Sequence, residues 1–294
     1  MPHFIHSTII NNPKGEKQVG GHWGGPVKMV FEDGKLKKPS PFPSELSFFQ
    51  DVSSGKYPIA TKYNLIPRYF GSEKITLDVP LSQQQSMAND DGSTPEFGEF
   101  YYLIMDDVTY GFKMPCVLDI KMGTRSWHEK CCMGEKIHRH IEKDRLSSNS
   151  LYGFKIAAMR TKDVTTGEDV DYPRDFAWHF RDDVSMTSAL KKFFDCCPSE
   201  KRAETLRHYS ERVGQVREFM LEFHYEFINS SLLLVFDADP TSEKKPVLYM
   251  IDFAHMFPIE GVNDGYIKGC DELVRFFGIL EKDYDGAAKS TPPS

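Results

Sequence analysis

The sequence lacks any apolar run that approaches the roughly 20 residues of a membrane-spanning helix, so we expect no membrane span. Its start, residues 1–12, lacks a basic segment followed by a long apolar stretch, and we expect no secretory signal. No internal repeat is present. Hydrophobic residues make up 40% of the 294 residues and charged residues 27%, which is ordinary for a soluble globular protein. This length suffices for one large domain or for two lobes that share a cleft.

Positive charge is in deficit, because 36 Lys and Arg residues stand against 43 Asp and Glu residues, for a net charge of -7. Nucleic acids attract proteins with an excess of basic residues, so we expect no nucleic-acid partner. The overall balance is compatible with a local basic pocket.

Cysteine spacing typical of metal or redox motifs is also missing. The six cysteines form no C-x-x-C pair, and two pairs are adjacent in sequence. This pattern favours reduced thiols in the cytoplasm or the nucleus. Zinc binding is the alternative, although the ligand spacing of zinc sites is absent. The cysteines are Cys116, Cys131, Cys132, Cys196, Cys197 and Cys270.

The first part of the chain has the pattern of strands and turns. We expect a strand over 27–31 that ends at the turn Asp33-Gly34. The prolines of 39–43 are expected to interrupt regular structure. Ser44 can cap a helix that begins near Glu45 and buries an apolar face.

The later part of the chain is more helical, and the whole indicates an α+β protein with two lobes. A polar loop is expected over 87–96 and a disordered end over 286–294. The expected strands are 97–105, 116–121, 231–237 and 246–252, the last two as a hairpin, and the expected helices are 129–143, 188–194, 201–228 and 271–280.

The most informative segment is Pro115-Cys-Val-Leu-Asp119-Ile-Lys121-Met-Gly123. Residues two apart on a strand point to the same face, so Asp119 and Lys121 project together. Such a pair can hold a hydroxyl-bearing group and a phosphate in one site, and Gly123 permits an unusual backbone turn. The alternative interpretation is a surface ion pair.

This segment resembles the P-x-x-x-D-x-K-x-G signature of the inositol polyphosphate kinase family, and it is most similar to that of the inositol hexakisphosphate kinases. Other segments resemble motifs of the same family in the same order. They are Gln18-Val-Gly-Gly-His22, Ser230-Ser-Leu-Leu233, Ile251-Asp-Phe-Ala-His255 and Asp264-Gly-Tyr-Ile-Lys-Gly269.

The resemblance implies a two-lobed fold related to protein kinases, with ATP between the lobes and a helical substrate-binding segment in the larger lobe. We expect a first lobe over 1–105, a second lobe over 106–282 and a disordered tail over 283–294. A conventional protein kinase is disfavoured, because the sequence has neither a G-x-G-x-x-G loop nor an H-R-D triplet.

The resemblance also implies how ATP is bound. Lys38 would contact the ATP phosphates, with Lys37 as the alternative, and Glu45 could pair with that lysine. Asp106 and Val108 would bind adenine through a backbone carbonyl and a backbone N–H.

On the same resemblance, Asp119 would hold the ribose hydroxyls and Lys121 would meet the transferring phosphate and the substrate. Asp252 would bind Mg²⁺, because a carboxylate is the hard oxygen ligand that this ion prefers. His255 would contact the substrate. Ser231 has either a site role or a structural one.

Cations recur along the helix expected after the signature. Lys136, Arg139, His140 and Lys143 follow i, i+3, i+4, i+7 spacing and share one helix face. Cations gathered on one face repel each other, so this face favours an anionic partner over a merely solvated surface. The family carries its substrate-binding helix at this position, and Arg160 is a further candidate there.

We therefore expect a monomeric, ATP- and Mg²⁺-dependent kinase of the cytoplasm or nucleus that phosphorylates inositol hexakisphosphate. An inositol polyphosphate multikinase that acts on inositol trisphosphate or tetrakisphosphate is the alternative, as is mixed specificity. A non-catalytic sensor or scaffold for inositol phosphates is the competing class. Intact candidates at Lys38, Asp119, Lys121 and Asp252 argue against that class.

Overall fold

The protein is described by a computed structural model over residues 29–40, 42–75, 100–132, 134–173, 176 and 180–290. The expected opening motif at 18–22 and the expected loop at 87–96 lie outside the described residues. Strands and helices alternate through the described chain, which confirms the α+β class.

The first part of the chain forms a four-stranded antiparallel sheet. The expected turn at Asp33-Gly34 is confirmed, since both residues have positive φ, 48° and 76°, as a tight hairpin requires. In sheet order the strands are β1 (Val30–Glu32), β2 (Lys35–Ser40), β4 (Phe100–Asp106) and β3 (Tyr69–Ile75).

The expectation that proline interrupts regular structure at Pro39 is wrong, because β2 continues through it to Ser40. The short strand β1 pairs with β2 only as far as Lys37. Beyond that point, within the described residues, β2 pairs only with β4, and on its other side a missing N–H costs no ladder hydrogen bond.

Two helices follow β2, namely α1 (Pro43–Ser53) and α2 (Pro58–Lys62). Ser44 does not cap α1 as expected. The helix begins at Pro43, and the Ser44 hydroxyl donates instead to the backbone carbonyl of Ala254 at 2.6 Å. Proline suits this first position because its fixed φ is already helical. The apolar face of α1 is buried as expected, with Phe48 and Phe49 at its centre.

The second part of the chain forms a five-stranded antiparallel sheet. The signature strand is its central member, and the expected hairpin over 231–252 is confirmed. In sheet order the strands are β10 (Val247–Ile251), β9 (Ser231–Asp237), β5 (Pro115–Met122), β6 (Phe154–Lys162) and β7 (Asp169–Tyr172).

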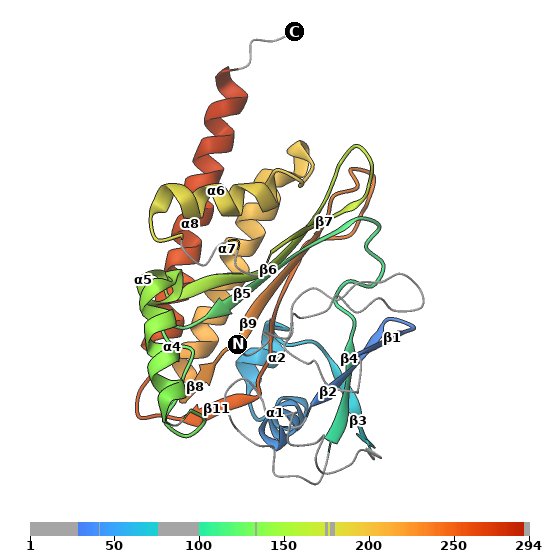
Figure 1. Ribbon diagram of the computed structural model, residues 1–294. Coiled ribbons are helices and arrows are strands. Elements are labelled where there is room, and N and C mark those ends of the chain that lie inside the picture. The colour runs from blue at the N-terminus through green and yellow to red at the C-terminus, as the bar shows by residue number, and fades with distance from the viewer. Residues whose placement is uncertain are drawn as a thin grey trace, which may run out of the picture.

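Helices cover the five-stranded sheet, and Figure 1 shows α7 and α8 side by side behind it, with α4 and α5 at one end. The four-stranded sheet and α1 lie at the lower right of this view. A single core cluster includes buried side chains from the elements of both sheets. The helices are α4 (Glu135–Leu146), α5 (Ser148–Tyr152), α6 (Asp183–Phe194), α7 (Ser199–Glu222) and α8 (Asp264–Ser290).

The helix expected over 201–228 ends earlier, at Glu222. The next residues form β8 (Tyr225–Ile228), which pairs with β11 (His255–Pro258) in a two-stranded sheet. An aromatic and β-branched run suits a strand, and pairing with β11 stabilises that choice over helical propensity.

The helix α8 continues to Ser290 and so extends into the range 283–294 where we expected a disordered tail. Tyr284 anchors this extension. Its hydroxyl donates to Asp195 at 2.9 Å, and Lys191 and Arg202 lie over its ring. These contacts order a segment whose composition alone looks unstructured.

The last helix starts at Asp264, earlier than the expected residue 271, and glycines explain how its first turns pack. A Cβ on Gly269 would lie 2.3 Å from the carbonyl oxygen of Gly153, and one on Gly265 would lie 2.6 Å from Oγ1 of Thr124. These glycines therefore let α8 pack directly against the end of β5 and the start of β6. Their role is structural, since they fix the position of the strand that carries Asp119 and Lys121.

The chain passes from one sheet to the other after Asp106, where β4 ends. The division into two lobes at this residue stays a prediction. Within the described ranges, none of the helices combines the length and apolar character that a membrane crossing demands.

Candidate active site

The two sheets meet at a cluster of two lysines and two carboxylates. Lys38 on β2 places Nζ 2.7 Å from Glu45 Oε1 and 2.7 Å from Asp252 Oδ1. Lys121 on β5 places Nζ 3.7 Å from the other carboxylate oxygen of Asp252. Asp252 therefore lies between lysines from both sheets, and these charges are mostly shielded from solvent.

Glu45 is held rigidly at the buried end of this cluster, with 1% of its surface exposed. Its carboxylate accepts hydrogen bonds from the Ser40 hydroxyl at 2.8 Å and from the Phe253 backbone N–H at 3.2 Å. Burial opposes the charge of Lys38, but Asp252 and Glu45 outweigh it and raise the pKa of the Lys38 ammonium. The lysine is thus a fixed cation in the neutral pH range.

The structure separates the two candidate lysines of β2. Successive residues on a strand point to opposite faces, and Lys37 turns away to form an ion pair with Glu73 at 2.9 Å. That pair is half exposed to solvent. Only Lys38 reaches Asp252, so of these two residues Lys38 is the one placed in the cluster.

Asp252 follows β10 and adopts a left-handed backbone with φ 64°. Aspartate tolerates this conformation at some cost, and such local strain is typical of functional sites. The next residue, Phe253, is fully buried and packs 4.3 Å from Phe48 of α1, measured between ring centroids. This hydrophobic anchor holds the carboxylate at the meeting point of the two sheets.

The central strand β5 carries Asp119 and Lys121 on one face, as its alternation predicts. Lys121 donates to the Asn229 carbonyl at 2.9 Å and to the Ser231 hydroxyl at 3.4 Å. Ser231 thereby positions the lysine, a role that its motif alone did not reveal. Gly123 has φ 101°, which confirms the expected need for glycine after this strand.

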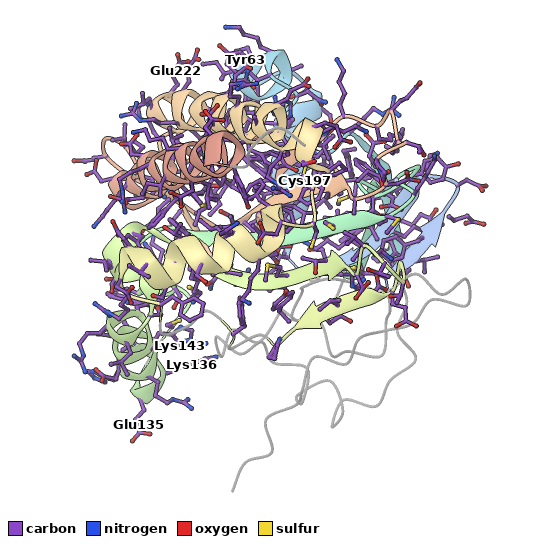
Figure 2. All side chains as sticks on the ribbon, turned by 90° about the horizontal axis from the view of Figure 1, so that it is seen from above. Tyr63, Glu135, Lys136, Lys143, Cys197 and Glu222 are labelled. Atoms are coloured by element: carbon purple, nitrogen blue, oxygen red, sulfur yellow. The ribbon has the colours of Figure 1, made fainter. Side chains whose placement is uncertain are left out.

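The cationic helix α4 starts at Glu135, six residues later than the expected start at 129. Figure 2 shows Lys136 and Lys143 leaving α4 on the same side, whereas Glu135 projects from its N-terminal end. Arg139 and Lys143 are exposed, and Lys136 and His140 are half-buried. The predicted face therefore exists as a surface accessible to an anion.

A buried carboxylate that sequence reasoning missed ties α4 to the signature strand. Asp144, 4% exposed, accepts from the backbone N–H and the hydroxyl of Ser126 at 2.6 and 2.8 Å. Asn149 donates to the same carboxylate at 2.9 Å. Because Ser126 lies on the segment that leaves β5 after Met122, this network ties the cationic face to the strand that carries Lys121. In the sequence, the only signal for Asp144 is its position next to Lys143.

His140 differs from the other members of the predicted face. It makes a 3.1 Å contact through Nδ1 with the Ser126 hydroxyl. Burial and the neighbouring Lys143 lower its pKa below the usual value of 6.5, against the opposing effect of Asp144. This lowered pKa favours the neutral imidazole of His140 at pH 7 in the free protein.

Two further candidates, Arg160 and His255, have their described contacts outside the cluster. Arg160 on β6 is 6% exposed and donates through Nε to Asp171 at 2.6 Å, so part of its hydrogen-bonding capacity is used within the sheet. His255 begins β11, and its ring meets Phe42 edge-on at 5.0 Å. It lies three residues after Asp252, on the side of α1.

The segment that joins the sheets carries Asp106 and Val108, the residues expected to meet adenine. Asp106 ends β4 and accepts from the Arg68 side chain at 3.3 Å. Asp107 caps the following turn by accepting from the N–H and the hydroxyl of Thr109. Val108 lies inside this turn, at the passage between the sheets.

Sequence reasoning also missed Lys155, which lies on β6 directly opposite Lys121. It is 7% exposed. Burial lowers the pKa of its ammonium to about 8, with Asp144 opposing this effect and Lys143 and Lys121 adding to it. A buried cation beside two others is a further sign of a site for an anion.

The cluster suits a divalent metal ion only in part. Among the described residues, no group of three His, Cys, Asp or Glu side chains could surround an ion. Asp252 offers one carboxylate, 27% exposed at its side chain. That is the arrangement expected for Mg²⁺ or a similar ion whose other ligands are phosphate oxygens and water.

Comparisons with known proteins identify the family of this chain. Residues 102–278 match the family model described as inositol polyphosphate kinase. The inositol polyphosphate multikinase of Schizosaccharomyces pombe is 26% identical over 274 residues, which cover 90% of this chain and 97% of that protein. The inositol hexakisphosphate kinase 3 of Mus musculus is 27% identical over 220 residues, covering 65% of this chain and 53% of that protein.

A solved structure shares the fold. The crystal structure of the inositol phosphate multikinase of S. cerevisiae, in complex with ADP and Mn²⁺, matches with a TM-score of 0.64. Sequence identity is 20%, and the match covers 84% of this chain and 99% of that chain. The likeness confirms the α+β, kinase-like fold.

Proposed function

Because this chain belongs to the inositol polyphosphate kinase family, we propose that it transfers the terminal phosphate of ATP to an inositol polyphosphate at the cluster around Asp252. The observation that carries this proposal is the convergence of Lys38 and Lys121, from different sheets, on one carboxylate. Phosphoryl transfer depends on positioning and charge neutralisation, and this arrangement supplies both.

Lys38 is assigned to the ATP phosphates, held in place by Glu45. Asp106 and Val108 would meet the adenine through backbone groups, and Asp119 would hold the ribose. Asp252 would bind Mg²⁺, which neutralises charge on the phosphate oxygens when bound. The solved relative that holds ADP and Mn²⁺ supports a nucleotide and a divalent ion for this chain as well.

Lys121 is assigned to the transferring phosphate. In the reaction the bond between the terminal phosphorus of ATP and its bridging oxygen breaks, and ADP leaves with that oxygen. A new bond forms to an acceptor oxygen, which is either a hydroxyl that loses its proton or a phosphate oxygen. A fixed ammonium at this position stabilises the charge that develops on the transferring group.

Lys136, Arg139, Lys143 and Arg160 would bind the phosphates of the acceptor, with His255 and neutral His140 as polar contacts. The cation-rich face favours inositol hexakisphosphate, which carries the most phosphates, with diphosphoinositol pentakisphosphate as product. The second candidate is a multikinase that acts on inositol trisphosphate or tetrakisphosphate. It is favoured by the S. pombe multikinase, whose match covers 90% of this chain.

One assay separates these candidates. The protein is incubated with γ-labelled ATP, Mg²⁺ and each member of a panel of inositol phosphates, and the products are identified by NMR. A diphosphate product from inositol hexakisphosphate supports the first candidate, and ring phosphorylation of lower inositol phosphates supports the second. A chain that binds these compounds without transferring label is a sensor or scaffold instead.

A further inference from the structure

Lys155 and Lys121 form a cross-strand pair of like charges. They lie directly opposite each other on β6 and β5, and 7% and 9% of their surfaces are exposed. Residues directly opposite in an antiparallel pair project to the same face, and like charges there are destabilising. The pair is nevertheless kept, largely buried, beside the candidate site, and a role in binding an anion would explain why.

A β-bulge puts Lys155 on this face. Arg160 lies opposite Val117 and Ala158 lies opposite Asp119, but the register then shifts by one residue before Lys121 pairs with Lys155. Without this shift, Lys155 and Arg160 would lie on different faces of the sheet, because successive strand residues alternate between the two faces. Bulges beside active sites often serve to re-aim a side chain in this way.

The surroundings of Lys155 are short of negative charge. In the portion of the chain that the structure covers, no acceptor receives a hydrogen bond from its ammonium. The charges that act on it are Lys121 of β5 and Lys143 and Asp144 of α4. Asp144 is already occupied by Ser126 and Asn149.

Burial without a partner disfavours the charged form of a lysine. This cost falls when an anion enters, because a phosphate can accept hydrogen bonds from several ammonium groups at once. Lys155 is a neighbour of Lys121, at the proposed transfer centre, and the charge of Lys143, on the proposed substrate helix, also acts on it. An anion that reached both would pass beside it.

We propose that Lys155 is a further substrate-binding residue, which contacts the acceptor phosphate that lies between Lys121 and Lys143. This assignment rests on the proposed function. With Lys155, strand β6 as well as the cationic face of α4 would select for multiply phosphorylated rings. Acceptors that lack a phosphate at that ring position gain nothing from Lys155.

The test compares Lys155→Met with Lys162→Met. Lys162 lies on the same face of β6 but pairs with Asp169 at 2.7 Å, away from the cluster. Loss of one charge-assisted contact should raise KM for inositol hexakisphosphate by about 10-fold or more in Lys155→Met. KM for ATP should stay at the wild-type value, and Lys162→Met should change neither constant.

Two added measurements keep the outcomes distinct. Lys155→Gln gives the same comparison if the methionine variant fails to fold, and Lys155→Arg should restore most of the affinity. Calorimetric binding of inositol hexakisphosphate is measured on wild type and variants without ATP. Weaker binding by Lys155→Met or Lys155→Gln supports the assignment even if the protein transfers no phosphate, an outcome that would remove the proposed function alone. Equal binding by wild type and variants overturns the role of Lys155 and leaves the proposed function standing.

Discussion

Lys38 and Asp252 lie 214 residues apart in sequence and 2.7 Å apart in space. Lys38 belongs to the four-stranded sheet, and Asp252 follows a strand of the five-stranded sheet. Their contact ties the two sheets together at the point where Lys121 also approaches. Lys37, the neighbour of Lys38 on β2, makes no such contact and therefore serves as a matched control.

Lys38→Met should abolish most activity, whereas Lys37→Met should leave it nearly intact. The first change removes the proposed phosphate-binding cation, and we expect kcat/KM to fall by about 100-fold or more. The second removes only a solvent-exposed ion pair with Glu73, and exposed pairs of this kind contribute little to a protein. Steady-state kinetics on both variants check this. Equal losses in the two would remove the special position of Lys38.

Lys121→Ala should lower kcat more than it raises KM for ATP. The ammonium is assigned to the transferring phosphate, where its attraction is greatest in the transition state. We expect kcat to fall by roughly 100-fold, with KM for ATP changed by only a few-fold. The measurement is a full ATP titration at saturating acceptor. A variant with wild-type kcat and a raised KM for ATP would show that Lys121 serves only nucleotide binding.

Arg139→Ala and Lys143→Ala should raise KM for the acceptor and leave KM for ATP unchanged. The control is Arg145→Ala, since Arg145 lies on the same helix but pairs with Glu142 at 2.6 Å. The increase should grow with the number of acceptor phosphates and should shrink as salt is added, because screening weakens attraction between exposed charges. Acceptor titrations at two salt concentrations test this. If all three variants behave alike, the cationic face is only a solvated surface.

The unpaired charge of Lys155 should also affect stability in the absence of ligand. Burial, opposed by Asp144 and reinforced by Lys143 and Lys121, lowers the pKa of Lys155 to about 8 in the folded protein. An unfolded lysine keeps its proton up to about pH 10.4, so the charged group destabilises the fold most below pH 8. Lys155→Met should therefore stabilise the protein at pH 7, on the order of 1–3 kcal/mol.

The stability advantage of Lys155→Met should fade between about pH 8 and 10. In this range wild-type Lys155 loses its proton on folding, so the folded protein no longer contains the buried charge. Denaturant unfolding of both proteins at pH 7 and pH 10 measures the difference. A variant that is less stable than wild type at pH 7 would contradict an unpaired buried charge at this position.

Much of the site follows from short-range patterns. Strand alternation places Asp119 and Lys121 on one face, and helical spacing gathers the cations of α4. These periodicities depend on local geometry, so sequence is sufficient to predict them. The contact between Lys38 and Asp252 depends instead on how two sheets meet, and the sequence did not predict it.

Other features could not be predicted because they depend on tertiary contacts. The bulge in β6 reverses the side on which Lys155 lies, and nothing in its own sequence announces the shift. Residues of β8 follow a long helix without a proline or glycine to end it, and their strand forms because β11 offers a partner. The end of α8 is ordered by Tyr284 against α6 and α7. In each case packing overrides local propensity.

The most direct test of the central claim is transfer of label from γ-labelled ATP to inositol hexakisphosphate and to lower inositol phosphates, by wild type and by Asp252→Asn. The amide keeps the shape of the carboxylate but loses the charge assigned to Mg²⁺. The account predicts transfer to at least one inositol phosphate by wild type and a loss of about 100-fold in kcat in the variant, with unchanged folding. Undetectable transfer by wild type, or near-normal kcat for Asp252→Asn at saturating Mg²⁺, would contradict it.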